Sequence, residues 1–410
     1  MYREILVNVT NGVTKVAVLE EGQVAEIYVE QGGDERIIGN IYKGIVNNVL
    51  PGMQAAFVDI GLEKNAFLYV QDLSNCPANG SVNICDLVKE GQEIVVQVKK
   101  EPVGGKGARV TTKLTLPGRY LVLMPHVAHI GVSLRIEEQV ERERLTQIAS
   151  ELKPEKAGLI VRTIAAGASP EVFKQDLKSL LKLWQKIKQR MANSSAPTLL
   201  HQDLRLIPRV LRDLFSEDVQ KLRINSAGVS ERILTYLDVF APDLKQRVDR
   251  CDTQQLFDKY HVEKEIKRSL NRKVWLKNGA YLVFDQTEAL TVIDVNTGKF
   301  IGASNLADTV FKTNCVAARE IVRQLRLRNI GGIIIIDFID MDTEEHRQKV
   351  LDILENELKK DRVKTSILGL TALGFVEMTR KKIRPPLTNV LEEKCPFCDG
   401  KGRVAATFEN

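Results

Sequence analysis

Two stretches of the sequence, ALTVIDVNTG at residues 289–298 and GGIIIIDFID at residues 331–340, decide the predicted architecture. Each contains an apolar run that ends in an aspartate, Asp294 in the first and Asp337 in the second. A helical segment over about 306–328 separates them, so we interpret this region as a strand, a helix and a strand. If the two strands are parallel neighbours, both carboxylates emerge at the same edge of the sheet, where open α/β sheets usually place ligands.

Two carboxylates that converge at one edge repel each other unless a proton or a cation intervenes. Mg²⁺ prefers oxygen ligands and is usually held by one or two carboxylates together with water and substrate phosphate. The ordinary alternative is that each Asp caps a following turn or helix. Asn296, two residues after the first Asp, favours the metal interpretation. Spacing alone leaves the choice among Asp337, Asp340 and Asp342 open.

Length and composition set the broad class. A chain of 410 residues is too long for one core and predicts two to four domains, and 44% hydrophobic with 27% charged residues is typical of a globular protein. A net charge of +6 and a pI near 8.8 are compatible with a polyanionic partner, but many other proteins are equally basic. The sequence has neither an apolar run long enough for a membrane span nor an apolar signal core, so we expect a cytoplasmic protein.

The rest of the chain changes its pattern several times. Residues 1–30 alternate as strands, with Asn11-Gly12 as a hairpin turn. Short β segments over about 36–112 predict a small barrel. Residues 113–205 are mixed and include an amphipathic helix at 170–191.

Three further groups of residues are candidates for binding. Phe57 and Phe67 lie in adjacent predicted strands, where exposed aromatics would stack on bases and Lys106 would meet the backbone, although a Phe in a strand is usually part of the core. Arg162 and Thr163 follow an apolar strand and could hold a terminal phosphate, although an Arg at a strand end is usually solvated or ion-paired.

The third group is Cys395 and Cys398, which form a C-x-x-C motif in a loop rich in Pro and Gly. A closed zinc site takes four ligands, so the simplest completion borrows two thiolates from a second subunit. A redox pair or two free thiols are the alternatives, but a redox C-x-x-C usually opens a helix.

Taken together, these motifs resemble the ribonuclease E/G family over about residues 1–404. The resemblance rests on Asp294-Val-Asn296-Thr-Gly, Arg323-Gln-Leu-Arg-Leu-Arg328, Asp337-Phe-Ile-Asp340-Met, G-L-I-V-R-T and C-P-x-C-x-G-x-G. It implies a multidomain α+β and α/β fold in which a split RNase H-like scaffold carries inserted domains. The implied domains are the RNase H-like scaffold at 1–35 and 206–268, an S1 barrel at 36–112, a 5′ sensor at 113–205, a DNase I-like catalytic domain at 269–390, a zinc-link at 391–404 and a tail at 405–410.

The resemblance also implies roles for individual residues. Asp294 and Asp337 would bind Mg²⁺ and Asn296 would assist catalysis, whereas Asp340 belongs to the motif without a clear role. Phe57, Phe67 and Lys106 match RNA-contacting positions, and Lys364 matches a basic residue near the active site, although such basic stretches are usually solvated. Val122, Arg162 and Thr163 match the sensor of a 5′-monophosphate. Cys395 and Cys398 match the zinc-link that joins two protomers.

We therefore expect an endoribonuclease that hydrolyses single-stranded, A/U-rich RNA with Mg²⁺ in RNA processing and decay. The resemblance implies a preference for 5′-monophosphorylated ends and products with 5′-phosphate and 3′-hydroxyl ends. It also implies a zinc-linked homodimer, while the end of this sequence at Asn410 leaves a tetramer open. The rival hypotheses are a non-catalytic RNA-binding protein that uses the S1 barrel and a redox protein that uses the two cysteines.

Overall fold

The computed structural model describes residues 2–32, 36–77, 82–102, 105–251, 253, 255–298, 306–398, 400 and 402–404, and divides the chain into two compact units. The first unit comprises Met1–Gly32, Glu217–Glu231 and Gln246–Asn410, and the second comprises Gly33–Ser216 and Arg232–Lys245. The tail predicted at 405–410 lies outside the described residues, as do Asp399 and Lys401 of the predicted zinc-link. Within the described part, no helix is long and apolar enough to cross a membrane.

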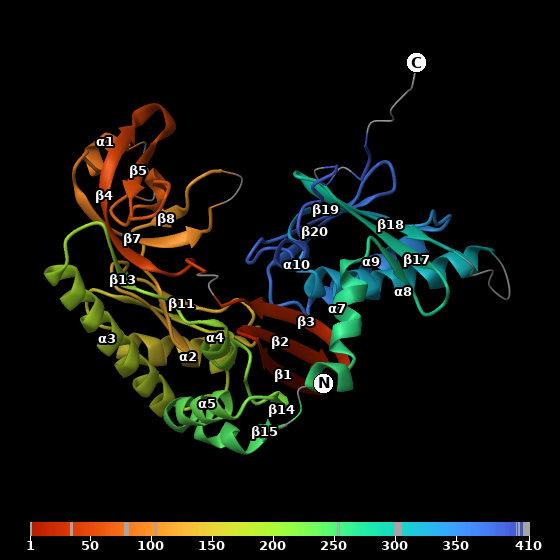
Figure 1. Ribbon diagram of the computed structural model, residues 1–410, viewed down its shortest axis with the longest axis horizontal. Coiled ribbons are helices and arrows are strands. Elements are labelled where there is room, and N and C mark those ends of the chain that lie inside the picture. Colours follow the sequence, from red (N-terminus) through yellow and green to blue (C-terminus); the bar gives the residue numbers. More distant parts are fainter. Residues whose placement is uncertain are drawn as a thin grey trace. The chain divides into compact units, whose positions relative to one another are not determined.

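The second unit contains a closed barrel (Figure 1). Its five strands are hydrogen-bonded in the order β4-β5-β6-β8-β7, and an additional pairing of β4 with β7 closes the ring. Side chains alternate along the strands, so that Val58 and Leu68 are fully buried in the barrel core. The strands are β4 (Ile41–Leu50), β5 (Ala55–Asp59), β6 (Ala66–Tyr69), β7 (Glu93–Lys100) and β8 (Arg109–Thr111), with β13 (Thr198–His201) added beside β4 and the short helix α1 (Ile84–Leu87) before β7.

A smaller sheet in the same unit has the strand order β11-β12-β10-β9. Phe173 and Leu177 of a long helix pack on the buried residues of this sheet, because apolar side chains recur along one face of that helix. The amphipathic helix predicted at 170–191 is confirmed as α3. The elements are β9 (Leu116–Pro117), β10 (Leu121–Met124), β11 (Ile130–Val132), β12 (Gly158–Val161), α2 (Gln139–Leu152), α3 (Pro170–Asn193) and α4 (Leu206–Asp213).

The first unit begins with a five-stranded sheet in the order β15-β14-β1-β2-β3. Asn11 and Gly12 connect β1 to β2 and both have positive φ, 49° and 78°, as a type I′ hairpin turn requires, so the predicted turn is confirmed. Two strands from residues 219–250 complete the sheet, and one of them pairs with β1 in parallel. The elements are β1 (Arg3–Thr10), β2 (Val13–Glu20), β3 (Gln23–Glu30), β14 (Val219–Ile224), β15 (Val248–Arg250), α6 (Leu256–Lys259) and α7 (Val262–Leu270); α5 (Ala227–Phe240) is divided between the two units.

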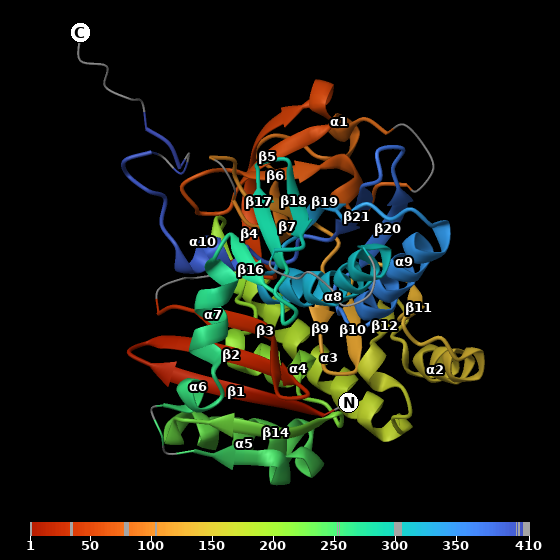
Figure 2. The same cartoon turned by 90° about the vertical axis from the view of Figure 1, so that its right-hand side faces the viewer.

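A six-stranded sheet follows in the first unit, in the order β16-β17-β18-β19-β21-β20. The pair β18 and β19 is parallel, whereas the other neighbours are antiparallel. Helices α8 and α9 cover one face, so that Ile293 and Ile336 are fully buried against them (Figures 1 and 2). The elements are β16 (Lys273–Trp275), β17 (Tyr281–Gln286), β18 (Leu290–Asn296), α8 (Leu306–Leu327), β19 (Gly332–Asp337), α9 (Glu344–Leu358), β20 (Thr365–Leu370), β21 (Val376–Arg380) and α10 (Leu387–Leu391).

Buried arginines near the end of α8 connect this helix to the first sheet. Arg326 donates to both carboxylate oxygens of Glu20 at 2.8 Å and to Glu26 at 2.9 Å. Arg323 pairs with Glu320 and Glu265 and also donates to the carbonyl of Val24. Burial by itself raises the pKa of Glu26, but the nearby positive charges of Arg326 and Arg384 lower this pKa to about 2. These carboxylates therefore stay ionised inside the protein, and the ion pairs hold α8 in place.

Arg328, the last arginine of the motif, also has its contacts within the first unit. Its guanidinium carbon lies 4.2 Å from the ring centroid of Phe284, and it donates to the carbonyl of Asn271 at 2.8 Å. The motif Arg323-Gln-Leu-Arg-Leu-Arg328 is thus buried apart from the partly exposed Arg323, and its arginines have their contacts within this unit.

The predicted mixed α+β class and the barrel are confirmed. The predicted helix at about 306–328 is confirmed as α8. The names RNase H-like and DNase I-like, and the predicted domain boundaries, remain predictions.

We expect the variant Arg326→Met to lower the free energy of unfolding of the first unit by about 3–5 kcal/mol, because it leaves Glu20 and Glu26 buried without their main cation. Urea unfolding followed by the fluorescence of Trp275, with Trp184 replaced by Phe, measures this change. The matched control is Arg319→Met on the same helix, where the exposed side chain predicts a change within about 0.5 kcal/mol. Equal stability of both variants would contradict a stabilising role for the buried pairs.

Candidate active site

The two aspartates at the ends of the apolar strands lie side by side. Asp294 of β18 and Asp337 of β19 are direct partners in the parallel register. Because their neighbours Ile293 and Ile336 point into the core, both carboxylates point to the opposite face of the sheet, which we call the open face. Asn296 lies two residues further on the same face and donates its side-chain N–H to Asp294 Oδ2 at 2.7 Å. The structure therefore brings the three predicted catalytic residues together.

Helix α8 also fixes the backbone that follows Asp337. The fully buried side chain of Asn314 donates to the carbonyl of Ile339 at 2.7 Å and accepts the N–H of the same residue at 3.2 Å. Such a two-point contact holds the turn that carries Asp340. Asp340 itself is exposed, as is Asp342. Of the three candidates in this segment, Asp337 is the one in register with Asp294.

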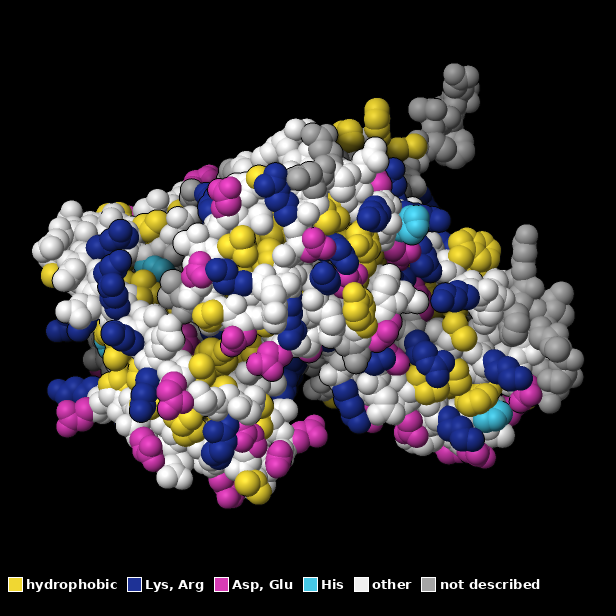
Figure 3. Space-filling view, turned by 90° about the horizontal axis from the view of Figure 1, so that it is seen from below, with side chains coloured by type: hydrophobic (Ala, Val, Ile, Leu, Met, Phe, Trp, Pro, Cys, Tyr) yellow, Lys and Arg dark blue, Asp and Glu magenta, His cyan; other side chains and the backbone are white. Residues whose placement is uncertain are grey.

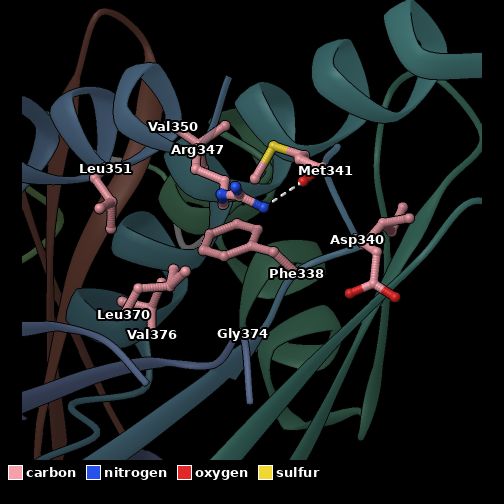
Figure 4. A pocket seen from close by; sticks show the side chains of 10 residues that line it. Phe338, Asp340, Met341, Arg347, Val350, Leu351, Leu370, Gly374 and Val376 are labelled. Carbon is pink, nitrogen blue, oxygen red and sulfur yellow. Dashed lines mark hydrogen bonds between the residues drawn. The ribbon is translucent and has the colours of Figure 1, made fainter. Parts of the chain in front are cut away.

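A small pocket lies beside this turn (Figure 4). Arg347 of α9 lines it and donates to the carbonyl of Met341 at 2.7 Å. The same guanidinium pairs with Glu344 at 2.9 Å, so its charge is neutralised by its own helix. The walls are otherwise mainly apolar, with Phe338 at the end of β19 and Val376 from β21. Arg347 therefore contacts the backbone of the Asp340–Met341 turn from α9.

The electrostatics of the carboxylates fit a divalent cation. Burial raises the pKa of Asp337, and the negative charges of Asp294 and Asp340 raise it further. A cation between Asp294 and Asp337 would relieve this repulsion, and one or two carboxylates with water and phosphate is the usual protein contribution to a Mg²⁺ site. No group of three or more His, Cys, Asp or Glu placed to hold a metal occurs among the described residues. The donor set thus suits Mg²⁺ with substrate oxygens as further ligands.

In the barrel, Phe57 and Phe67 are direct cross-strand partners. Their ring centroids are 5.9 Å apart in an edge-to-face arrangement, and both side chains are half-buried. Lys106 is exposed and lies in the segment before β8. The alternative that both phenylalanines belong to the core does not hold, because the buried residues of these strands are their neighbours Val58 and Leu68.

The predicted sensor residues lie at one end of the β10–β12 pair. Val122 is opposite Ile160 in this ladder, and the backbone N–H of Arg162 continues it by donating to the carbonyl of Tyr120. The Arg162 guanidinium donates to the carbonyl of Gly118 at 2.5 Å and to Asp213 at 2.6 Å. The hydroxyl of Thr163 is exposed and lies 2.8 Å from that of Ser133.

A buried aspartate on α3 supports this end of the ladder. Asp176 accepts the backbone N–H groups of Arg119, Tyr120 and Leu121 at 2.8–3.1 Å. It thereby fixes the turn whose Gly118 carbonyl orients Arg162. Arg162 is therefore ion-paired with Asp213 and held in a defined plane, and 23% of its side chain stays exposed.

Backbone N–H groups point at both sulfurs of the cysteine pair. The pKa of the Cys395 thiol is lowered, mainly by hydrogen bonds from the backbone N–H groups of Cys398 and Phe397. The N–H of Gly402 donates to the sulfur of Cys398 at 3.2 Å. Backbone donors that point at sulfur favour the thiolate, which is the form that binds metal.

One predicted residue and three further residues also belong to the first unit. Lys364 is exposed immediately before β20, an edge strand that β21 separates from β19. No motif predicted a role for Lys273, Trp275 and Tyr281, which share the open face with Asp294. The sequence feature that could have identified them is the alternation in KVW at residues 273–275, which places Lys273 and Trp275 on one face of a strand.

The distribution of charge on the surface does not by itself indicate a binding face. On the face of the molecule in Figure 3, Lys and Arg side chains are interspersed with Asp and Glu. The positive net charge is therefore not gathered into one basic surface on that face.

A mixed α+β fold with paired carboxylates on an open sheet face and a barrel that presents aromatic side chains is suited to metal-assisted hydrolysis of a phosphodiester. Comparison with known proteins identifies the family. The family model described as the ribonuclease E/G family matches residues 115–383. Ribonuclease G of Escherichia coli (strain K12) is 48% identical over 414 residues, covering 98% of this chain and 85% of that protein.

Two other relatives agree. Ribonuclease G of Haemophilus influenzae is 47% identical over 411 residues, covering 98% of this chain and 84% of that protein. Ribonuclease E of Nostoc sp. is 41% identical over 394 residues, covering 95% of this chain and 57% of that protein. The chain therefore belongs to the ribonuclease E/G family and is an endoribonuclease.

Proposed function

We propose that this endoribonuclease hydrolyses single-stranded RNA at internal sites with Mg²⁺ held by Asp294 and Asp337. The observation that carries the proposal is the direct pairing of these two residues in the parallel register, with Asn296 bonded to Asp294. The preference for A/U-rich sites, the 5′-phosphate and 3′-hydroxyl products and a role in RNA processing and decay follow from the family resemblance.

Each residue of the site has its own proposed role. Asp294 and Asp337 supply negatively charged oxygens, and the N–H donated by Asn296 fixes the orientation of the Asp294 carboxylate. Asp294 and Asp337 would hold Mg²⁺, which would supply Lewis-acid chemistry for hydrolysis of the phosphodiester. The buried contact between Asn314 and Ile339 keeps the backbone after Asp337 in position. Lys364 is the proposed basic residue for a phosphate of the substrate.

Binding of single-stranded RNA is supported by the barrel. Phe57 and Phe67 present a half-exposed pair of rings, and base stacking on such rings contributes on the order of 1–3 kcal/mol per base. Stacking requires unpaired bases, so it favours single strands over duplexes. The exposed ammonium of Lys106 is available for the RNA backbone.

The sensor proposal rests on the orientation of Arg162. Its contacts with Gly118 and Asp213 take one N–H from each terminal nitrogen, which leaves further donors of the guanidinium for a 5′-monophosphate. The Thr163 hydroxyl is adjacent and exposed, and we assign Val122 a backbone contact. The preference for a monophosphate over a triphosphate follows from the family resemblance.

The zinc proposal rests on the two cysteines. Cys395 and Cys398 supply two thiolates, and a structural site takes four ligands. We propose that the same pair of a second chain completes the site and forms a homodimer.

We expect purified protein to cut a fluorescent, A/U-rich oligoribonucleotide with a 5′-monophosphate in Mg²⁺ and not in EDTA. Asp294→Asn and Asp337→Asn should each lower kcat at saturating metal by at least about 100-fold, because each removes a charged metal ligand. The matched control is Asp342→Asn, an exposed neighbouring carboxylate that we expect to be dispensable. Undiminished cleavage by Asp337→Asn would show that the metal assignment is wrong, and tight binding without cleavage would favour a non-catalytic RNA-binding protein.

Arg162→Ala should abolish the preference for 5′-monophosphorylated over 5′-hydroxylated RNA, while the rate on the 5′-hydroxylated substrate stays within about twofold. The reason is that charge-assisted contacts to the phosphate disappear and the catalytic residues are untouched. The ratio of kcat/KM for the two RNAs measures the effect. Arg205→Ala, at an exposed arginine of the same unit, is the control. An unchanged ratio in Arg162→Ala would exclude this residue from the sensor.

For the cysteine pair, we expect about half a zinc ion per chain and a dimer in sedimentation experiments. The double variant Cys395→Ser, Cys398→Ser should lose the zinc and become monomeric, whereas Cys85→Ser, at another exposed cysteine, should retain both properties. One zinc per monomeric chain would contradict sharing between subunits. A zinc-free protein whose two thiols oxidise reversibly would support the redox interpretation.

A further inference from the structure

Three side chains form a cluster at the end of the six-stranded sheet, on its open face. Trp275 of β16 and Tyr281 of β17 are direct cross-strand partners, with ring centroids 5.2 Å apart and ring planes 58° apart. The ammonium of Lys273 lies 3.4 Å from the centroid of Tyr281 and 4.3 Å from that of Trp275. We call these three residues the β16–β17 cluster.

The β16–β17 cluster adjoins the paired carboxylates. Tyr281 is the register partner of Asn296, and Asp294 lies opposite Val283, two residues along β17. Residues related in this diagonal way have their Cβ atoms roughly 7–8 Å apart on one face of a sheet. Gly298 leaves room for the ring, because a Cβ at this position would lie 3.1 Å from Cδ1 of Tyr281. The cluster is therefore about one nucleotide away from a phosphate at Asp294.

Packing within the unit does not account for the exposed indole. The core of the sheet lies on the other face, where Val274 and Leu282 are fully buried. Trp275, by contrast, is 48% exposed. A large aromatic surface beside a catalytic site, with a cation next to it, matches the pattern of a stacking platform that tracks a single strand.

We propose that the β16–β17 cluster is a nucleotide subsite for the residue of RNA next to the scissile phosphate. The base stacks on the indole of Trp275 beside Tyr281, and the ammonium of Lys273 contacts a backbone phosphate. Every base has a π face, so this subsite positions the strand without reading its sequence. The inference rests on the proposed function, because it places the scissile phosphate at Asp294 and Asp337.

Fluorescence tests the contact without any cleavage. The chain has two tryptophans, so replacing Trp184 by Phe leaves Trp275 as the sole indole. In this background with Asp337→Asn, a single-stranded oligoribonucleotide in Mg²⁺ should quench the Trp275 emission as it saturates the protein. Anisotropy of a label on the same RNA shows that binding has occurred. Unchanged emission at saturation would overturn the proposal.

Kinetics test the role of the contact. Trp275→Ala should lower kcat/KM by about 5- to 150-fold on an intact oligoribonucleotide, and Trp275→Phe should restore most of the rate. The loss should disappear on a substrate with an abasic residue on one side of the scissile phosphate, and the position of that residue identifies the nucleotide that stacks. A loss of the same size on every abasic substrate would mean that Trp275 acts through structure, and no loss on the intact RNA would also overturn the proposal.

Matched controls separate this proposal from general effects. Tyr2→Ala removes an aromatic side chain with a similar exposure, 44%, from the residue that precedes β1 in the same unit and should leave kcat/KM unchanged. Lys273→Ala should reduce kcat/KM and its salt dependence, whereas Lys277→Ala, four residues further and also exposed, should not. If the wild-type protein does not cut RNA in Mg²⁺, the proposed function is wrong. If the wild-type protein cuts RNA and Trp275→Ala cuts it equally well, only the proposed nucleotide subsite is wrong.

Discussion

The parallel pairing of β18 with β19 is the constraint on which the rest of the first unit depends. A parallel pair needs a crossover connection, and α8 supplies it by packing on the face of the sheet where Ile293 and Ile336 are buried. With that face occupied, the alternation of the strands leaves Asp294 and Asp337 on the other one. A slip of one residue in either strand would turn its aspartate into the core and an isoleucine out of it, so burial of the apolar side chains fixes the register and thereby the carboxylate pair.

The arginines of α8 show how the same helix is attached on its other side. Removing Arg326, Glu20 and Glu26 from water is costly, and such groups persist only when each has partners at good geometry. Here the guanidinium of Arg326 binds both oxygens of Glu20 and one of Glu26, and Arg3 supplies a second positive charge to Glu20. Apolar side chains could shift along one another at an interface, whereas the directional hydrogen bonds of this ion pair fix one arrangement of the helix. The helix that forms the crossover of the six-stranded sheet is therefore fixed against β2 and β3.

A related principle operates in the second unit, where ordinary structural contacts orient the candidate binding groups. Asp176 satisfies three backbone N–H groups of one turn, and that turn presents the Gly118 carbonyl to Arg162. In the barrel, buried Val58 and Leu68 turn Phe57 and Phe67 outward. In each case the groups with a proposed role in binding RNA are held by neighbours that never meet it. This arrangement suits sites that must be preorganised, because the cost of ordering the side chains is met on folding.

The sequence by itself determined the strands that end in Asp294 and Asp337, the intervening helix, the hairpin turn at Asn11-Gly12, the barrel segments and the family. These are local signals, since hydrophobic period, turn residues and motif spacing are written along the chain. Only the tertiary structure decided that Asp337, rather than Asp340 or Asp342, stands beside Asp294, that Arg326 is an internal partner of Glu20, and that Trp275 and Tyr281 share a face with Asn296. Each of these depends on which strands become neighbours and in what register, and register follows from the burial of side chains that are remote in sequence.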